Sequence, residues 1–250
     1  MWGSMIQIWS MTDIGLLRKE NQDAFMVVQN APSGHTICVV CDGMGGSAGG
    51  SLASAIAVET FTSELQKILT AEMTVEQMKE ACAYAVSLAN AAIGQAAKEN
   101  PEYRSMGTTL VSAVTCGDDV VFTNVGDSRA YHICESGISR VTKDHSLVER
   151  MVDQGEITME EARYHPSRNL ITRALGLDTD AQCDKFLHSF SAGEYILLCT
   201  DGLSGTVTDQ EMLFEVIHGN NPDTCLNRLL EIANSQGAPD NVTAVLMRKS

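Results

Sequence analysis

The chain has 250 residues, of which 44% are hydrophobic and 20% are charged, and its formal net charge is −15. This length allows one large domain or two small ones, each with a real hydrophobic core. The acidic balance argues against binding to nucleic acid and to anionic membranes, since both require basic patches.

The cysteines and the start of the chain bear on the compartment. Most of the eight cysteines lie inside apolar runs, which is typical of small core residues. The first basic residue is Arg18, so the basic segment of a secretory signal is missing. No stretch is apolar enough to cross a membrane. We therefore expect reduced thiols and a cytoplasmic protein.

The first two predicted strands are Ile6–Ser10 and Ala24–Val28, and they flank a polar segment. That segment contains Arg18 and Asp23, which suit a phosphate and a metal ion respectively. Taken alone, the two residues are better explained as an ordinary surface ion pair.

The run Thr36–Gly46 ends a β-branched apolar stretch in Asp42 and Gly43 and then continues into a helical pattern. Such a run predicts a strand that is buried on both faces. The Asp-Gly pair indicates either a turn or a carboxylate and carbonyl that bind a hard divalent cation. Cys38 and Cys41 form a C-x-x-C pattern, but residues three apart in a strand face opposite sides, which argues against a zinc or redox site.

Helices and a strand-rich meander follow. Capping boxes open helices at Thr74 and Thr208, and Asn221 with Pro222 opens another. The remaining predicted elements are helices over Ser51–Leu69, Thr74–Asn100, Ser146–Arg163 and Pro222–Ser235, and strands over Thr108–Thr115, Val120–Asn124, Ala130–Cys134, Ile138–Thr142, Phe186–Phe190, Glu194–Thr200 and Val242–Met247. This order predicts one α+β domain with largely antiparallel sheets and helices outside them.

Four carboxylates stand at the ends of predicted strands, although they are far apart in the sequence. They are Asp42, Asp127, Asp201 and Asp240. If the fold brings these strand ends together, the side chains form the oxygen-rich cluster that a divalent cation requires.

Six short motifs are spread over nearly the whole chain. They are Gly15–Asp23, Asp42–Gly46, Met106–Thr109, Gly126–Ala130, Asp201-Gly202 and Asp240-Asn241. In these motifs and their order the chain resembles the PP2C (PPM) family of metal-dependent protein serine/threonine phosphatases, and its bacterial members most of all.

The resemblance implies a four-layer αββα sandwich formed by residues 1–250 as a single domain, with a flap-like segment over about 146–170. From the residues alone, a flap and a simple connection explain the loop His165–Asn169 equally well. The resemblance also implies Mn²⁺ or Mg²⁺ as cofactor, with two core ions and a third, weaker one.

The resemblance further implies a role for each site residue. Asp42 would bridge the two core ions, and the Gly43 carbonyl would bind one of them. Asp201 and Asp240 would bind the other ion. Asp23 would hold metal-bound water, and Asp127 would bind the third ion together with Asp201. Arg18 would grip the substrate phosphate through its planar fork of N–H groups.

The reaction that the resemblance implies is hydrolysis of phosphoserine and phosphothreonine on proteins, opposing a cognate kinase, by a monomeric enzyme. Two cations about 3.5–4 Å apart neutralise the phosphate and acidify a bridging water, whose hydroxide attacks phosphorus in line. Two positions depart from many relatives: Met44 replaces a histidine that is proposed as general acid, and Gln22 replaces a glutamate.

Two other functions compete with this interpretation. Cys134–Arg140 matches the C-x-x-G-x-x-R pattern of cysteine-based phosphatases, but it lies between two predicted strands instead of before a helix. The chain could also be a non-catalytic binding module on the same scaffold. The presence of all four carboxylates argues against that alternative.

Overall fold

The computed structural model describes residues 5–29, 33–177, 180–219 and 221–250, and two antiparallel sheets form its centre. From edge to edge, the first sheet consists of β1 (Ile6–Asp13), β11 (Val242–Lys249), β10 (Tyr195–Cys199), β7 (Arg129–Cys134) and β8 (Gly137–Arg140). The second consists of β2 (Asp23–Val28), β3 (Ile37–Met44), β5 (Leu110–Cys116), β6 (Asp119–Val125) and β9 (Asp184–Ser189), and β4 (Gly107–Thr108) pairs with the end of β3.

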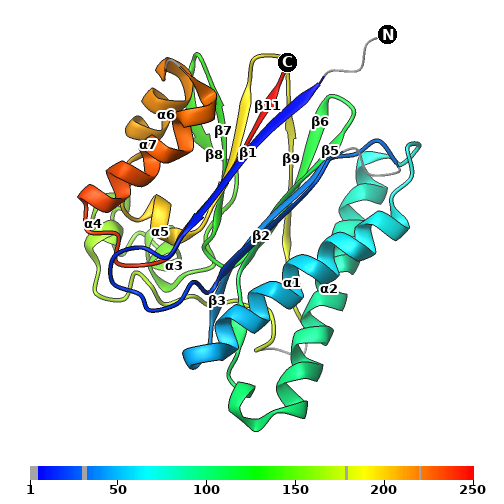
Figure 1. Ribbon diagram of the computed structural model, residues 1–250, viewed down its shortest axis with the longest axis vertical. Helices are drawn as coiled ribbons and strands as arrows, with labels where there is room; N and C mark the ends of the chain where they lie inside the picture. The colour runs from blue at the N-terminus through cyan, green and yellow to red at the C-terminus, as the bar shows by residue number, and fades with distance from the viewer. Residues whose placement is uncertain (1–4, 30–32, 178–179, 220) are drawn as a thin grey trace.

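The helices lie on the two outer faces of the paired sheets (Figure 1). The second sheet is covered by α1 (Gly46–Ile68) and α2 (Val75–Glu99). The first sheet is covered by α5 (Asp201–Ser204), α6 (Asp209–His218) and α7 (Pro222–Ser235). In the part of the chain that the structure describes, no helix combines the length and the apolar character needed to cross a membrane.

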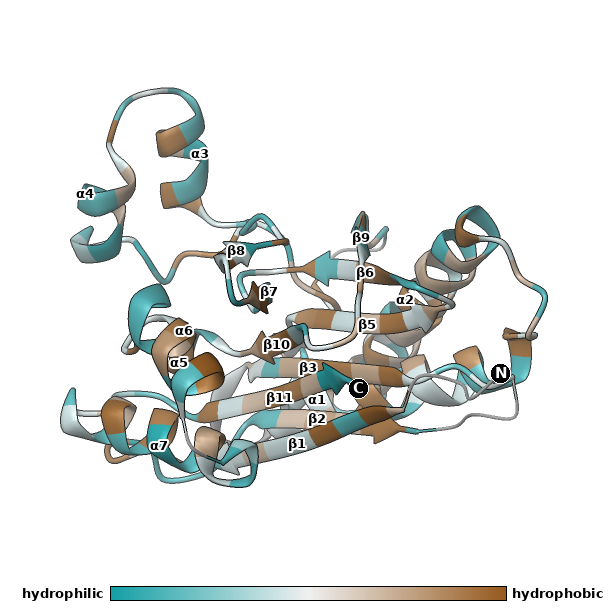
Figure 2. Ribbon diagram, turned by 90° about the horizontal axis from the view of Figure 1, so that it is seen from above, coloured by the Kyte–Doolittle hydropathy of each residue, from teal (hydrophilic) through white to brown (hydrophobic). Residues whose placement is uncertain are grey.

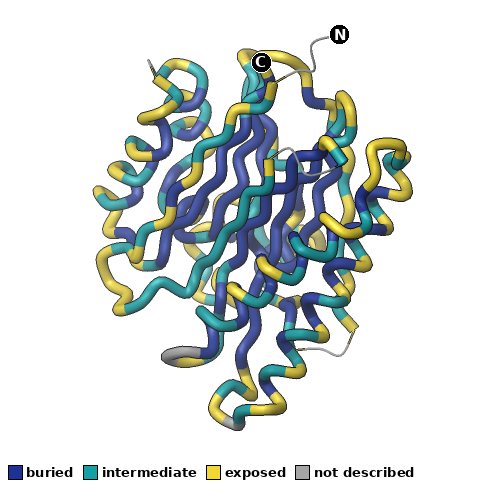
Figure 3. Tube along the Cα trace, turned by 45° about the vertical axis from the view of Figure 1, so that its right-hand side comes forward, coloured by how far each residue is buried: buried dark blue, intermediate teal, exposed yellow. Residues whose placement is uncertain are grey.

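Three hydrophobic clusters separate the four layers. One lies between the two sheets and includes Val40, Phe122 and Leu198. The other two lie between each sheet and its helices. The central strands are buried along most of their length, as Figure 3 shows, and the ribbon of β5 and β10 is mostly in the hydrophobic colour in Figure 2. The predicted four-layer αββα sandwich is confirmed.

The strand that contains Asp42 shows why its sequence is apolar on both faces. Cys41 packs against the helices, whereas Cys38 packs between the sheets. Because β3 is covered on both sides, both sets of alternating side chains are apolar. The prediction that Cys38 and Cys41 face opposite ways is confirmed.

The sequence predicted one continuous helix over Ser146–Arg163, and this prediction is wrong. The structure has two short helices, α3 (Leu147–Asp153) and α4 (Met159–Tyr164), separated by a turn. Gly155 in that turn has a φ of +71°, a conformation that ends a helix readily in glycine. Thr158 then opens α4 with a capping box of its own. Both helices project beyond the sheets in Figure 2.

The helix starts that capping patterns predicted are confirmed. Thr74 accepts a hydrogen bond from the Gln77 N–H, and the side-chain oxygen of Gln77 accepts one from the Thr74 N–H. Thr208 forms the equivalent box at the start of α6, and Asn221 caps α7 with Pro222 at its first position. Short-range hydrogen bonds of this kind are visible in the sequence because both partners lie within three residues.

Candidate active site

The predicted metal ligands meet in one open cleft of about 510 Å³ at one end of the sandwich. Arg18 lies on its rim, and residues of the loop after α4 complete its wall. The predicted ligands that line it are Asp42, Gly43, Asp127, Asp201 and Asp240. Five predicted site residues from four separate parts of the chain are thus brought together.

Asp23 lies beside Asp42 but outside the lining of the cleft. The two residues are direct partners in the antiparallel β2–β3 pair. The Asp23 carboxylate accepts a hydrogen bond from the Thr200 hydroxyl at 2.9 Å, and Asp23 is not among the residues that line the cleft. Asp23 therefore stands behind the ligand cluster instead of within it.

The glycines of the two Asp-Gly pairs allow backbones to pack closely. A Cβ on Gly43 would lie 2.1 Å from the Gly50 carbonyl oxygen, and a Cβ on Gly202 would lie 1.9 Å from the Asn241 carbonyl oxygen. Neither contact tolerates a side chain, because both neighbours are backbone atoms. The second contact brings the segments of Asp201 and Asp240 together. Position 202 is therefore glycine because of this close packing and not because of a turn.

Asn241 fixes the loop that carries Arg18. Its amide nitrogen donates to the carbonyl oxygens of Ile14 and Glu20 at 2.9 and 3.0 Å, and its amide oxygen accepts from the Gln22 N–H at 2.9 Å. The loop between β1 and β2 is therefore attached to the start of β11 at several points. This assigns a structural role to the asparagine of the Asp240-Asn241 motif.

Arg18 pairs with Asp240 across the cleft rim. Its Nη2 lies 2.5 Å from Asp240 Oδ2, and 51% of the arginine side chain is exposed. The guanidinium is therefore fixed at one end and accessible at the other. The sequence predicted a phosphate ligand at this position, and the ion pair with Asp240 was not predicted.

Burial and mutual repulsion act on the carboxylates of the cleft. Burial first, and then the neighbouring carboxylates, raise the pKa of Asp42 and of Asp201. Burial and the charge of Asp201 also raise the pKa of Asp127. Burial raises the pKa of Asp23 to about 7. The carboxylates of Asp42 and Asp201 are close enough for each to affect the pKa of the other.

Comparison with known proteins identifies the group to which this architecture belongs. The sequence pattern of the family described as Protein phosphatase 2C matches residues 18–246. The chain belongs to the PP2C family of protein phosphatases.

Individual relatives agree with this assignment. The serine/threonine phosphatase stp of Listeria welshimeri is 35% identical over 96% of this chain and 94% of its own length. The crystal structure of the serine/threonine phosphatase Stp1 from Staphylococcus aureus is 35% identical, covers 98% of this chain and 96% of that one, and superposes with a TM-score of 0.90. The chain is accordingly a serine/threonine protein phosphatase of PP2C type.

A further similar structure bears on the cofactor. The catalytic domain of the serine/threonine protein phosphatase PstP, solved in complex with two manganese ions, is 29% identical, covers 98% of both chains and has a TM-score of 0.83. In the present PP2C chain, the donor set is made of carboxylates and a carbonyl, which suits a hard divalent cation.

The oxygen donors in and beside the cleft fit a divalent cation chemically, and several of them also contact other protein groups. Among the described residues, no three acidic, cysteine or histidine side chains lie close enough to hold one ion. Asp240 pairs with Arg18, and Asp23 accepts a hydrogen bond from Thr200. Asp23 Oδ1 and Asp201 Oδ1 are buried without any hydrogen-bond partner. Buried oxygens of this kind are costly unless another group neutralises them.

The pKa shifts predict how metal and pH together act on the stability of this PP2C chain. A carboxyl whose pKa is raised on folding stabilises the protein below its unfolded pKa of about 3.9, and this stabilisation is lost as the pH rises through its folded pKa. With Asp23 near 7, metal-free protein should lose stability between these values. Thermal unfolding should show a larger stabilisation by Mn²⁺ over EDTA at about pH 8 than at about pH 5. An equal gain at both pH values would contradict the proton–metal competition.

Hydroxyl groups that the sequence analysis did not assign hold the cluster together. Thr109 accepts from the Asp42 N–H through Oγ1 at 2.9 Å and donates its own N–H to the Asp42 carbonyl oxygen at 2.9 Å. Its hydroxyl also bonds to Ser128 Oγ at 2.7 Å. Thr109 lies within the motif Met106–Thr109 and Ser128 within Gly126–Ala130. These motifs were the only sequence signal that pointed to a role for the two hydroxyl groups.

The alternative of a cysteine-based phosphatase does not fit the structure. Cys134 and Gly137 are partners in the β7–β8 hairpin, whereas Arg140 lies opposite Tyr131. Three residues of strand, about 10 Å, therefore separate the cysteine from the arginine. Arg140 is also engaged by Glu149 at 2.8 Å, which makes it unavailable to a phosphate beside Cys134.

We expect Cys134→Ser to keep its phosphatase activity within about twofold of the unaltered enzyme, because a surface substitution of similar size changes little. The check is the steady-state rate on a small aryl phosphate. Cys116→Ser, at the end of β5 away from the cleft and partly exposed like Cys134, serves as the matched control. Complete loss of turnover in the Cys134 variant alone would restore the cysteine-based mechanism.

Proposed function

We propose that this chain hydrolyses phosphoserine and phosphothreonine on proteins in a reaction that depends on Mn²⁺ or Mg²⁺. One observation supports the proposal above the others. Asp42, Asp127 and Asp201 share one cleft in which burial and mutual repulsion raise their pKa values, so the cluster is poised to exchange protons for cations.

The proposed ligands follow from the cleft. Asp42 would hold both core ions, with the Gly43 carbonyl on one of them and Asp201 and Asp240 on the other. Asp127 would hold a third ion together with Asp201. When bound, such ions neutralise the phosphate and lower the pKa of water, so that hydroxide can attack phosphorus in line.

Arg18 and Asp23 would act on the phosphate and the water. The free N–H groups of Arg18 can donate two parallel hydrogen bonds to phosphate oxygens while Asp240 anchors the other side of the guanidinium. Asp23 Oδ1, which is buried and unpartnered, would accept a hydrogen bond from the attacking water. Met44 lines the cleft, but its side chain has no acidic proton, so it cannot protonate the leaving alkoxide.

The wider setting is part of the same proposal. Phosphorylated proteins would be the substrates, and a cognate serine/threonine kinase would be opposed. We further propose that residues 1–250 act as one monomeric domain in the cytoplasm, with no nucleic acid or membrane partner, and that 146–170 acts as a flap. Asn169 and Ile171 at the base of that segment line the cleft, which supports contact with substrate.

The test of the proposed function is a panel of phosphoserine, phosphothreonine and phosphotyrosine peptides with purified protein. We expect turnover of the first two with Mn²⁺ or Mg²⁺ and none in EDTA. Activity that survives EDTA would exclude the metal mechanism. Manganese binding without turnover of any peptide would favour the non-catalytic binding module.

Arg18→Ala should raise KM by about tenfold or more with a much smaller change in kcat, because a hydrogen bond to a charged group contributes roughly 1.5–3 kcal/mol. Arg18→Lys is the matched control, since it keeps the charge but loses the bidentate fork. The measurement is steady-state kinetics at saturating Mn²⁺. A KM equal to that of the unaltered enzyme would remove Arg18 from phosphate binding.

A further inference from the structure

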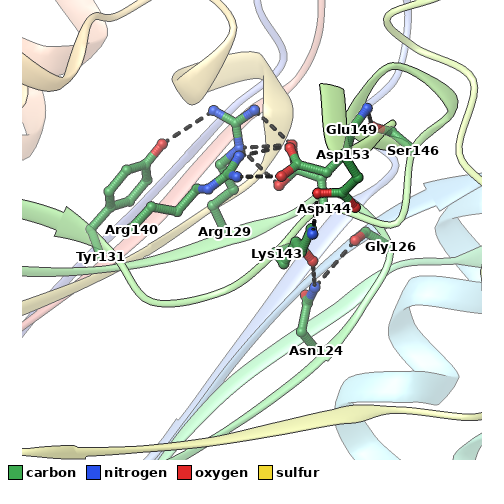
Figure 4. Close-up of polar contacts among 10 residues, drawn as sticks. All are labelled: Asn124, Gly126, Arg129, Tyr131, Arg140, Lys143, Asp144, Ser146, Glu149 and Asp153. Atoms are coloured by element: carbon green, nitrogen blue, oxygen red, sulfur yellow. Dashed lines mark hydrogen bonds and ion pairs between the residues drawn. The ribbon is translucent and has the colours of Figure 1, made fainter. Parts of the chain in front are cut away.

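The Gly126 residue directly before Asp127 is held on both sides by His145. The Gly126 N–H donates to His145 Nδ1 at 3.1 Å, and the Gly126 carbonyl oxygen accepts from the His145 N–H at 2.9 Å. Asn124 adds a hydrogen bond to the same carbonyl at 3.2 Å (Figure 4). A single residue thus satisfies both polar backbone groups at the corner between β6 and β7.

The backbone of this corner needs such support. Gly126 has a φ of +101°, and a Cβ there would lie 2.5 Å from Thr109 Cγ2. Glycine accepts this conformation but does not enforce it, because glycine has the widest choice of backbone angles. Contacts from outside the corner must therefore stabilise this conformation of Gly126. The same conformation sets the position of the neighbouring Asp127 carboxylate.

The His145 ring is itself fixed from its other side. Because Nδ1 accepts a hydrogen bond, the neutral ring carries its proton on Nε2, which lies 3.2 Å from Asp184 Oδ2. Arg173 Nη1 donates to Asp184 Oδ1 at 3.0 Å and so helps to hold that carboxylate beside the ring. His145 is 7% exposed, so the ring has little room to turn.

The backbone around His145 is anchored independently of the cleft. Asp144 forms a bidentate ion pair with Arg129: Nε donates to Oδ1 at 3.0 Å and Nη2 donates to Oδ2 at 2.7 Å (Figure 4). The His145 carbonyl oxygen accepts from the Thr172 N–H at 2.7 Å. The backbone at His145 is therefore fixed by other contacts, and His145 links the Gly126 corner to this fixed segment.

We propose that His145 is a positioning residue that holds the Asp127 carboxylate in place for a third divalent cation. The inference rests on the proposed function, because it takes Asp127 as a ligand of that ion. His145 does not touch the ion or the substrate in this account. Outer partners of metal ligands typically change metal affinity by about 10–100-fold when they are removed.

The experiment compares two isosteric variants. His145→Asn places an amide oxygen near the Nδ1 position, where it can still accept from Gly126, whereas His145→Gln extends its amide to the Nε2 position and leaves the Gly126 N–H without an acceptor. Mn²⁺ binding is counted by calorimetry and by the electron paramagnetic resonance of free Mn²⁺. Asp127→Asn defines the loss of the third ion, and thermal unfolding in EDTA reports the fold.

We expect His145→Gln to weaken the third Mn²⁺ by about tenfold or more, with two ions bound as in the unaltered protein, and His145→Asn to stay within about threefold. Equal third-ion affinity in His145→Gln and the unaltered protein overturns the proposal. Equal loss of stability in both variants with unchanged third-ion affinity also overturns it, since that is a purely structural role.

If His145→Gln does not fold, Asp184→Ala decides the question, because that carboxylate is 40% exposed and its loss frees only the Nε2 side of the ring. A weaker third ion at an unchanged melting temperature supports the proposal, and an unchanged affinity overturns it. Unaltered protein that binds two ions and no third would overturn the proposal while the proposed function stands. Unaltered protein that binds no Mn²⁺ would overturn the proposed function itself.

Discussion

Asp42→Asn is expected to lower kcat/KM by about 10³-fold, equivalent to roughly 4 kcal/mol of transition-state stabilisation. Asp42 is the carboxylate on which the proposed cluster depends most. It is partner to Asp23 in the β2–β3 pair, it lines the cleft, and the charge of Asp201 acts on it more strongly than that of any other carboxylate. An amide in its place has similar size but no negative charge, so it would no longer neutralise two cations.

The measurement for Asp42→Asn is steady-state kinetics on a phosphopeptide at saturating Mn²⁺. Asp119→Asn is the matched control, because Asp119 starts β6 at the end of that strand opposite to the Asp127 corner. We expect the control to keep full activity. If Asp42→Asn retained more than about a tenth of the activity, Asp42 would not bridge the ions.

Asp144→Ala is expected to lower the free energy of unfolding by about 3 kcal/mol, because it leaves a largely buried arginine without its partner. Asp144 has only 6% of its side chain exposed. It bonds to Arg129 at 2.7 Å, and Arg140 lies 3.5 Å from the same oxygen (Figure 4). Removing the carboxylate places two guanidinium groups together with no charge between them.

Asp153→Ala is the control for this prediction. Asp153 pairs with Lys143 nearby, but 47% of the aspartate and 48% of the lysine side chain are exposed. A pair so exposed is worth about 0–1 kcal/mol. Urea unfolding measures both variants. Equal losses of stability would show that burial does not strengthen the Arg129–Asp144 pair.

The sequence predicted the features that have local causes. The capping boxes at Thr74 and Thr208 are closed by residues three positions later, and both helices start there. The apolar run before Asp42 predicted a strand covered on both faces, because burial sets residue type directly. The position of the four aspartates at strand ends, together with the family resemblance, predicted that they converge.

The features that the sequence did not reveal depend on contacts between distant segments. The Arg18–Asp240 pair joins residues 222 positions apart, and no local pattern marks it. The glycine of Asp201-Gly202 is required by the backbone of Asn241 instead of by its own turn. The division of the segment 146–163 into two helices depends on Gly155, a residue that helices also tolerate at a modest cost.

The central claim is that the scattered aspartates enclose divalent cations, and a crystal structure of the protein grown with Mn²⁺ tests it most directly. We predict two ions in the cleft, both in contact with Asp42, with Asp201 and Asp240 on one of them. The claim is contradicted if Mn²⁺ at a concentration that supports turnover is bound elsewhere and no ion lies among these aspartates in the cleft.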